Sequence, residues 1–201
     1  NAGNSIASGG NYNTVVGDEA GTAITTGDAN TAVGYQAGDA INTGSSNTAV
    51  GFGAMSNQTS ASENTAFGRD ALFTNVTGTG ATAIGYSALV FATGNDNTAV
   101  GKSAGGAVTT GVQNTLIGGL AGDALTDADR NVAIGYSSLS SDTLGSYSVA
   151  IGRSALSAQN FTTATDAYNT AVGSAAGGAV TTGIQNTLIG GLAGDSLTDA
   201  D

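Results

Sequence analysis

The string Asn-Thr-Ala-Val-Gly at residues 47–51 decides the fold, because the chain writes it or a near copy of it eleven times. Sixteen or seventeen residues separate successive copies, except for one interval of 21 residues. A fixed period of this length predicts a solenoid, in which each repeat forms one coil and stacks on its neighbours. The motif ends at Gly17, Gly34, Gly51, Gly68, Gly85, Gly101, Gly118, Gly135, Gly152, Gly173 and Gly190.

A second, longer period is superimposed on the first. Residues 97–129 recur four coils later at 169–201, with 29 of 33 positions identical. We therefore expect the array to continue beyond residue 201, and residues 1–201 to form a single repetitive segment of a longer fibre. Its coils are expected to begin near residues 13, 30, 47, 64, 81, 97, 114, 131, 148, 169 and 186.

Each coil can be numbered from the motif Asn as position 1. Position 2 is Thr or Val, position 3 is mostly Ala, position 4 is always Val, Ile or Phe, and position 5 is always Gly. Short β-branched residues favour a strand over positions 2–4, with a second short strand over positions 6–9 and Gly at the corner between them. Strands of successive coils would stack in parallel about 4.8 Å apart, with the motif Asn side chains forming an amide ladder. The sequence therefore predicts an all-β parallel solenoid of about eleven coils.

Side chains alternate along a strand, so positions 2 and 4 share one face and position 3 takes the other. We expect the Val or Ile at position 4 to point into the coil and the Ala at positions 3 and 8 to point outward. No charged residue occurs in this alanine stripe, so a neighbouring copy is expected to cover it, giving a homo-oligomer with three chains as the favoured form. The stripe includes Ala32, Ala49, Ala66, Ala83 and Ala99, with Ala37, Ala54, Ala71, Ala88 and Ala104.

Two features are candidates for contact with a ligand or a neighbouring fibre. The long coil has four extra residues within Ser157–Tyr168, which are expected to bulge outward and to place Phe161 or Tyr168 at such a contact. Aromatic residues at position 6 are expected to face outward or into a groove, where they would stack on sugars or pack between chains. The position-6 tyrosines are Tyr35, Tyr86 and Tyr136.

The chain lacks the residues of most catalytic sites. It has no His and no Cys, which excludes the common triads, thiolate nucleophiles and zinc sites, so we expect no enzyme and no cofactor. The acidic residues are expected in solvated turns, and Asp142 in a loop where replacement by Asn costs almost nothing. The turn Leu-Thr-Asp-Ala-Asp at 125–129 and 197–201 offers oxygen ligands for calcium, although an ordinary turn is the favoured interpretation.

Charge and hydropathy limit the partners. The formal net charge is -11, with only four Lys and Arg, so we expect no binding to nucleic acid or to an anionic membrane. No stretch approaches the roughly 20 apolar residues of a membrane span. Ice binding needs an exposed Thr array, and it is disfavoured because Thr at position 2 is expected to share the inward face.

Two stretches, NVAIGYSSL at 131–139 and SVAIGRSAL at 148–156, resemble the head repeat of trimeric autotransporter adhesins, the YadA-like head. The resemblance implies a left-handed parallel β-roll with three chains side by side, and Val132, Ile134, Val149 and Ile151 in the core. The coils of that family are usually shorter than those of this chain. Similar NTAVG arrays occur in phage tail fibres and in surface proteins of aquatic bacteria.

We therefore expect an extracellular structural fibre, located on a cell surface or a virion. Its function would be that of an adhesin-like shaft or head that attaches to surfaces or cells, with itself, surface glycans or a host receptor as partners. One alternative is a phage tail fibre that recognises a host receptor. Another is a self-assembling extracellular filament without a specific ligand.

Overall fold

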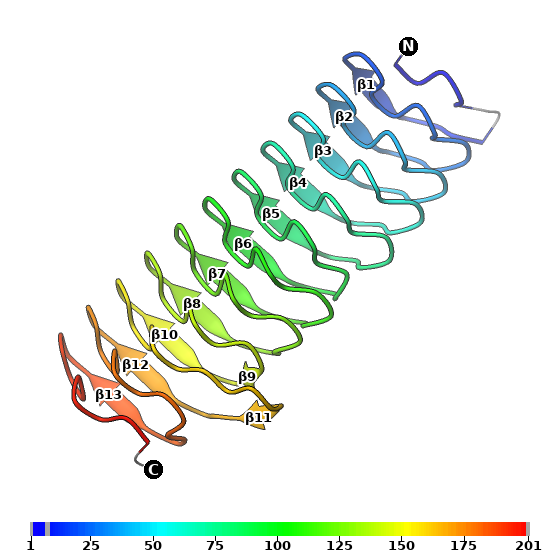
Figure 1. The fold of residues 1–201 in the computed structure, drawn as a ribbon. Coiled ribbons are helices and arrows are strands. Elements are labelled where there is room, and N and C mark those ends of the chain that lie inside the picture. The colour runs from blue at the N-terminus through cyan, green and yellow to red at the C-terminus, as the bar shows by residue number, and fades with distance from the viewer. Residues whose placement is uncertain (1, 7–8, 200–201) are drawn as a thin grey trace.

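The computed structural model describes residues 2–6 and 9–199, and these residues form strands and turns without any helix. One three-residue strand per coil joins a single parallel sheet that runs the length of the rod (Figure 1). Its strands are β1 (Thr14–Val16), β2 (Thr31–Val33), β3 (Thr48–Val50), β4 (Thr65–Phe67), β5 (Thr82–Ile84), β6 (Thr98–Val100), β7 (Thr115–Ile117), β8 (Val132–Ile134), β10 (Val149–Ile151), β12 (Thr170–Val172) and β13 (Thr187–Ile189). The strands β9 (Gly145–Ser146) and β11 (Thr165–Asp166) form a separate two-stranded sheet.

The register of the main sheet follows the motif. Each strand pairs with the same motif positions of the next coil, so that Ala32 is opposite Ala49 in the pair β2–β3. The long coil does not disturb this order, because Ala150 of β10 is opposite Ala171 of β12. The predicted parallel solenoid with coils of about 17 residues is therefore confirmed.

The predicted direction of the side chains is wrong. Alanines at positions 3 and 8, such as Ala83 and Ala88, are fully buried inside their own coil. Side chains at positions 2 and 4 point outward, and Phe67 and Ile84 are 56 % and 40 % exposed. The alanine stripe is therefore the core of the solenoid, and Ile134 lies on the outer face. The lumen of so small a coil leaves room for little more than a methyl group beside the strand.

Larger side chains fill the rest of the lumen, and they come mainly from positions 9 and 12, with Leu116 added from position 3. Where position 9 is Gly, an aliphatic residue at position 12 occupies the space beside it, and a Cβ on Gly38 would lie 2.8 Å from Cδ1 of Ile41. Where position 9 is Leu or Met, position 12 is polar or Ala, so an aliphatic side chain larger than Ala enters the lumen from only one of the two positions. The Gly-first pairs are Gly21 and Ile24, Gly38 and Ile41, Gly105 and Val108, Gly122 and Leu125, Gly177 and Val180, and Gly194 and Leu197; the others are Met55 and Gln58, Leu72 and Asn75, Leu89 and Ala92, Leu139 and Asp142, and Leu156 and Gln159.

Positions 6–9 form a turn instead of the predicted second strand. Position 7 adopts a left-handed conformation in every coil from 13 onward, as at Gln36, with φ 54°. Position 9 does the same, even where it is Leu, with φ 49° at Leu89. A strand needs extended backbone, so two left-handed residues in four exclude one.

Glycine at position 5 is required by the stacking of the coils. Gly118 has φ 131°, and a Cβ on it would lie 2.6 Å from the carbonyl carbon and oxygen of Gly135 in the next coil. The same close approach of glycine to glycine recurs from Gly17 to Gly173. The invariant fifth residue therefore forms a stack of backbone corners in which any side chain would separate two coils.

The predicted amide ladder of motif Asn residues is present inside the coil. The side-chain oxygen of Asn47 accepts a hydrogen bond from the backbone N–H of Asn64 at 3.1 Å, and its side-chain nitrogen donates to the carbonyl of Ala61 at 2.9 Å. Each rung thus joins two coils and closes its own coil. Both groups of a buried amide are thereby satisfied, which a buried polar side chain requires.

The ladder is repaired where the motif Asn is replaced by Ser148. Gln159 of the same coil donates to the Ser148 hydroxyl at 3.0 Å and accepts from the Asn169 side chain at 2.8 Å. Gln159 also donates to Asp142 at 2.6 Å. Asp142 is fully buried, so its expected position in an exposed loop is wrong.

The long coil is accommodated at its closing turn. Thr162, Thr163 and Ala164 are exposed, and the chain then returns to the stack, where β11 pairs with β9. Phe161 points inward and is only 6 % exposed. The predicted bulge is therefore confined to three exposed residues, while the residues after it form a short strand.

Candidate functional surfaces

The outer side of the main sheet is the largest regular surface of the molecule. It carries one row of Thr or Val from position 2 and one row of Val, Ile or Phe from position 4, repeated in each of the eleven strands. We call these two rows the sheet face. Within the part of the chain that the structure describes, no Thr hydroxyl of the sheet face has a hydrogen-bond partner. The sheet face is therefore mostly aliphatic and uncharged, with free hydroxyls along one side.

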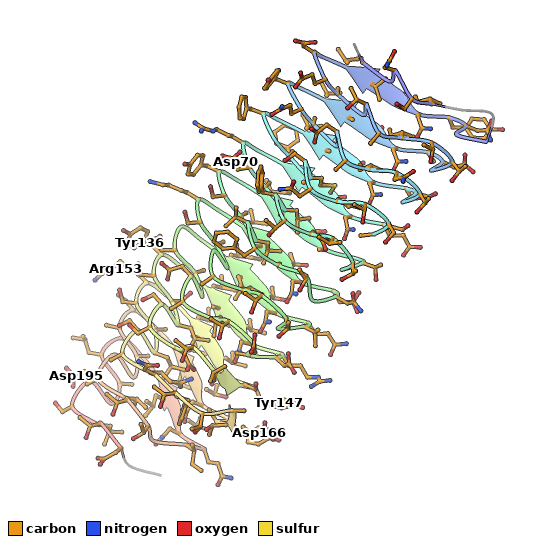
Figure 2. All side chains as sticks on the ribbon, turned by 45° about the vertical axis from the view of Figure 1, so that its right-hand side comes forward. Asp70, Tyr136, Tyr147, Arg153, Asp166 and Asp195 are labelled. Carbon is orange, nitrogen blue, oxygen red and sulfur yellow. The ribbon has the colours of Figure 1, made fainter. Side chains whose placement is uncertain are left out.

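A second surface follows the first corner of each coil. Position 6 carries exposed aromatic or cationic residues in seven coils, and we call these residues the sixth-position row. Figure 2 shows two of them, Tyr136 and Arg153, on the same long edge of the rod. The row comprises Tyr35, Phe52, Arg69, Tyr86, Lys102, Tyr136 and Arg153.

Members of the row in adjacent coils contact one another. The ring centroids of Tyr35 and Phe52 are 5.3 Å apart, and the Arg69 guanidinium lies 5.3 Å from the centroid of Phe52 and 5.7 Å from that of Tyr86. Arg69 therefore lies between two aromatic rings, an arrangement in which each ring attracts the cation. The predicted outward direction of Tyr35, Tyr86 and Tyr136 is confirmed, and they are 41 %, 47 % and 59 % exposed.

Acidic residues lie close to the N-terminal part of the row. The negative charge of Glu19, supported by partial burial and a hydrogen bond to Glu19, raises the pKa of the Tyr35 hydroxyl above its ordinary value. The Arg69 side chain pairs with Asp70 at 3.1 Å. Within the described residues, Lys102 and Arg153 form no ion pair, so the uncompensated positive charge lies in the C-terminal half of the row.

The opposite edge of the rod carries a smaller aromatic cluster. Tyr147 and Tyr168 are stacked with ring centroids 5.1 Å apart, and Arg130 lies 5.4 Å from the Tyr147 centroid. Arg130 also donates a hydrogen bond to the Tyr147 hydroxyl at 2.9 Å. Figure 2 places Tyr147 on the edge away from Tyr136. Tyr168 is exposed as predicted. Phe161 is buried in the same coil, so its side chain cannot reach a ligand.

The carboxylates of the proposed calcium turn contact the preceding coil instead of converging. Asp127 accepts hydrogen bonds from the hydroxyls of Thr109 and Thr110, both at 2.7 Å, and these bonds lower the pKa of the Asp127 carboxyl. Asp129 accepts from the backbone N–H of Val112 at 2.8 Å. The last two residues of the second copy, 200 and 201, lie outside the described residues. Among the residues that are described, no three acidic side chains gather in a way that could hold a metal ion.

Sequence reasoning found the aromatic half of the sixth-position row and missed its cationic half. The signal was available, because taking the sixth residue of every coil places Arg69, Lys102 and Arg153 in one register with the tyrosines. These are three of the four positive charges in the chain. They fall on one edge of the rod because each coil stacks on the next with equivalent motif positions in register.

No protein-family model, curated protein or solved structure matches the chain. Residues 2–6 and 9–199 enclose no pocket. No helix with the length and apolar character of a membrane span occurs in the same residues. Any function must therefore be argued from the sheet face and the two edges.

Proposed function

We propose that the chain is a self-associating structural rod of an extracellular fibre, which presents its edges for attachment to surfaces or cells. The observation that supports this most directly is the uncovered sheet face. Parallel sheets occur almost only with both faces buried. Here the coil covers one face, and the other exposes a continuous aliphatic row that a second copy of the chain would cover.

The chemistry of the sheet face suits a copy of itself. The sheet face carries uniform rows along its whole length, so copies arranged around one axis would each bury it in an equivalent way. Side chains of Val and Ile would bury apolar area, while the Thr hydroxyls, which have no partner in the described chain, would find one across the interface. We favour three chains around one axis. The contact between chains is then made by the sheet face and not by the alanine stripe, which was the contact expected from the sequence.

Light scattering on purified protein tests this association. Replacing Ile84 and Ile117 together by Arg places two charges on the sheet face, where they would be buried without a partner in the oligomer. We expect the wild-type protein to have the mass of an oligomer, three chains in the favoured form, and the variant to have the mass of one folded chain. Circular dichroism should show the same β spectrum for both, because these side chains point away from the core of the coil.

A matched control places two Arg residues elsewhere on the surface. Val76 and Phe91 are 41 % and 54 % exposed and lie in turns away from the main sheet. Their replacement by Arg should leave the oligomer mass unchanged. A wild-type protein that stays monomeric at every concentration, or equal dissociation by both pairs of substitutions, contradicts association through the sheet face.

The outward Thr row also supports ice binding as a second candidate. The sequence argument against it placed Thr on an inward face and so half-buried. The structure turns this face outward, although the Thr residues of the interior strands are only half-exposed there. A regular array of hydroxyl and methyl groups along the sheet face would order water at the ice surface. Growth of ice crystals tests this candidate on the wild-type protein at concentrations where light scattering reports a monomer, since ice binding needs the sheet face uncovered. The variant with Arg at Ile84 and Ile117 should be inactive, because both substitutions lie on that face.

A further inference from the structure

The sixth-position row concentrates positive charge on a strongly acidic chain. Three of four cations lie in it although the formal net charge is -11. From Tyr86 to Arg153 the next residue of every coil, at position 7, is uncharged, and in the described residues neither Lys102 nor Arg153 forms an ion pair. These neighbours are Ser87, Ser103, Leu120, Ser137 and Ser154. The C-terminal half of the row is therefore a local surface of positive charge with aromatic rings between the cations.

The rings in this half lie along the rod. A Cβ built on Gly119 would be 3.5 Å from Cδ2 of Tyr136, which shows that the Tyr136 ring leans over the neighbouring coil. Gly119 occupies position 6 of that coil and leaves the space open. Exposed rings placed in this way present faces against which the apolar face of a sugar ring can pack.

We infer that the sixth-position row binds a linear acidic glycan, with its tyrosines against sugar rings and its cations on the carboxylates or sulfates. The spacing of the positive charges along the row indicates which kind of anionic polymer fits it. Lys102 lies two coils from Arg69 and three coils from Arg153, or about 10 Å and about 14 Å at the strand spacing of a β-sheet. Such sparse cations fit a polymer in which charged sugars alternate with neutral ones.

A nucleic acid fits the same row less well. Each strand of a nucleic acid carries a negative charge about every 3.4 Å, and binding depends on neutralising many of them. Three cations spread over so many coils neutralise few, and the remainder of the chain repels a dense polyanion. Binding of single-stranded DNA is therefore a competing outcome that the experiment must be able to show.

The experiment measures binding of hyaluronan oligosaccharides, in which uronate alternates with a neutral sugar, to the immobilised chain of residues 1–201. Chitin oligosaccharides serve as the neutral probe and single-stranded DNA as the dense polyanion. We expect hyaluronan to bind most tightly and to weaken as salt screens the contacts. Replacing Lys102 and Arg153 together by Ser should lower hyaluronan affinity by about tenfold. Ser is tolerated at this position, since Ser174 occupies it in the recurring copy.

Two further variants separate the row from the rest of the surface. Replacing Tyr86 and Tyr136 together by Ser should weaken hyaluronan binding without removing its salt dependence. Replacing Arg130 by Ser removes one positive charge from the opposite edge, against two in the Lys102 and Arg153 variant, and affinity should stay within about twofold because a distant exposed charge is screened. An equal loss with the Arg130 variant, tighter binding of DNA, or no binding of hyaluronan by the wild-type protein overturns the inference.

The inference rests on the proposed attachment role and names its ligand class. Light scattering on the same samples reports self-association separately. An oligomer that does not bind hyaluronan therefore overturns the inference alone, whereas a monomer that binds it overturns the proposed association alone.

Discussion

Asp142 shows how a residue type that is usually solvated can become part of the core. One carboxylate oxygen accepts hydrogen bonds from the backbone N–H groups of Gly145 and Phe161, at 3.1 and 3.0 Å. The other accepts from the Gln159 side chain at 2.6 Å. Sequence alone did not place it, because the residue types at position 12 range from Ile and Leu to Asn, Gln and Asp and do not show that this position lies inside the coil.

Replacing Asp142 by Asn should therefore destabilise the protein, contrary to the sequence-based expectation of almost no effect. The new amide nitrogen would face the nitrogen of Gln159, and Gln159 cannot turn its oxygen toward it without losing the hydrogen bond from Asn169. A buried donor left without a partner costs about 1–3 kcal/mol. Urea unfolding followed by circular dichroism measures the loss.

Asp96 supplies the control for this substitution. It is exposed and has a left-handed backbone with φ 58°, a conformation that Asn adopts readily. Asp96→Asn should leave the unfolding midpoint unchanged. If Asp142→Asn is equally neutral, the buried network does not contribute to stability.

Asp123 differs from Asp142, because its buried carboxylate is not fully hydrogen-bonded. One of its oxygens is buried and has no hydrogen-bond partner, and this burial raises the pKa of the Asp123 carboxyl. A raised folded-state pKa means that the group favours folding below the unfolded-state pKa of about 3.9 and that this contribution is lost as pH rises through the folded-state value. At neutral pH the charged form opposes folding.

Asp123→Asn should therefore raise the melting temperature at pH 7, and the difference from the wild-type protein should disappear below about pH 3.9. Asp127→Asn is the control of opposite sign. The hydroxyls of Thr109 and Thr110 lower the pKa of Asp127, so its charge favours folding near neutral pH and this contribution is lost as pH falls through the lowered value. A lower melting temperature of Asp123→Asn at pH 7 would show that the carboxylate has an attractive partner.

At the scale of the single coil, the strand triplet and the glycine corner form one unit. Gly118 and Gly119 are adjacent in sequence but differ in what surrounds them. Gly118 has φ 131° and no room for a Cβ, whereas a Cβ on Gly119 would make an ordinary contact with Tyr136 at 3.5 Å. The corner therefore depends on the first glycine of the pair and not on the second.

Gly118→Ala should cost about 3 kcal/mol, because the backbone conformation is strained for any L side chain and the adjacent coil must move. Gly119→Ala should change stability by less than about 0.5 kcal/mol. Thermal melts of the two variants provide the comparison. Equal effects would mean that a side chain at the glycine corner does not lower the stability of the stack.

The coil also shows which part of the fold the sequence could determine. Period, parallel stacking, Gly corners and the Asn ladder follow from residues that recur in register. The sequence did not show which face of the strand points into the coil, because Thr-Ala-Val has an apolar side chain on both faces and alternation alone cannot choose between them. The exchange of volume between positions 9 and 12, as in Leu89 with Ala92 and Gly122 with Leu125, would have located the lumen next to Ala.

At the scale of the whole molecule, each strand of the main sheet contacts only the strands of the coils before and after it. Stability in such an array is a sum of coil terms and nearest-neighbour terms. The positions of the two long edges and of the sheet face then depend only on register. The sixth-position row stays straight over coils of 16 and 17 residues for this reason.

Removing one complete coil should therefore leave a folded solenoid. Deletion of residues 114–130 joins Gln113 to Asn131, so Asn97 and Asn131 become adjacent rungs of the amide ladder, and Ala133 takes the place beside Gly105 that Leu116 fills in the wild-type protein. Circular dichroism should keep its β spectrum, with a small decrease in melting temperature. Deletion of residues 114–121 alone shifts every later residue out of register and should abolish cooperative unfolding. If the two deletions lower stability equally, the coil is not the independent unit of this fold. The straight sheet face and sixth-position row, which the two proposals require, would then not be set by register.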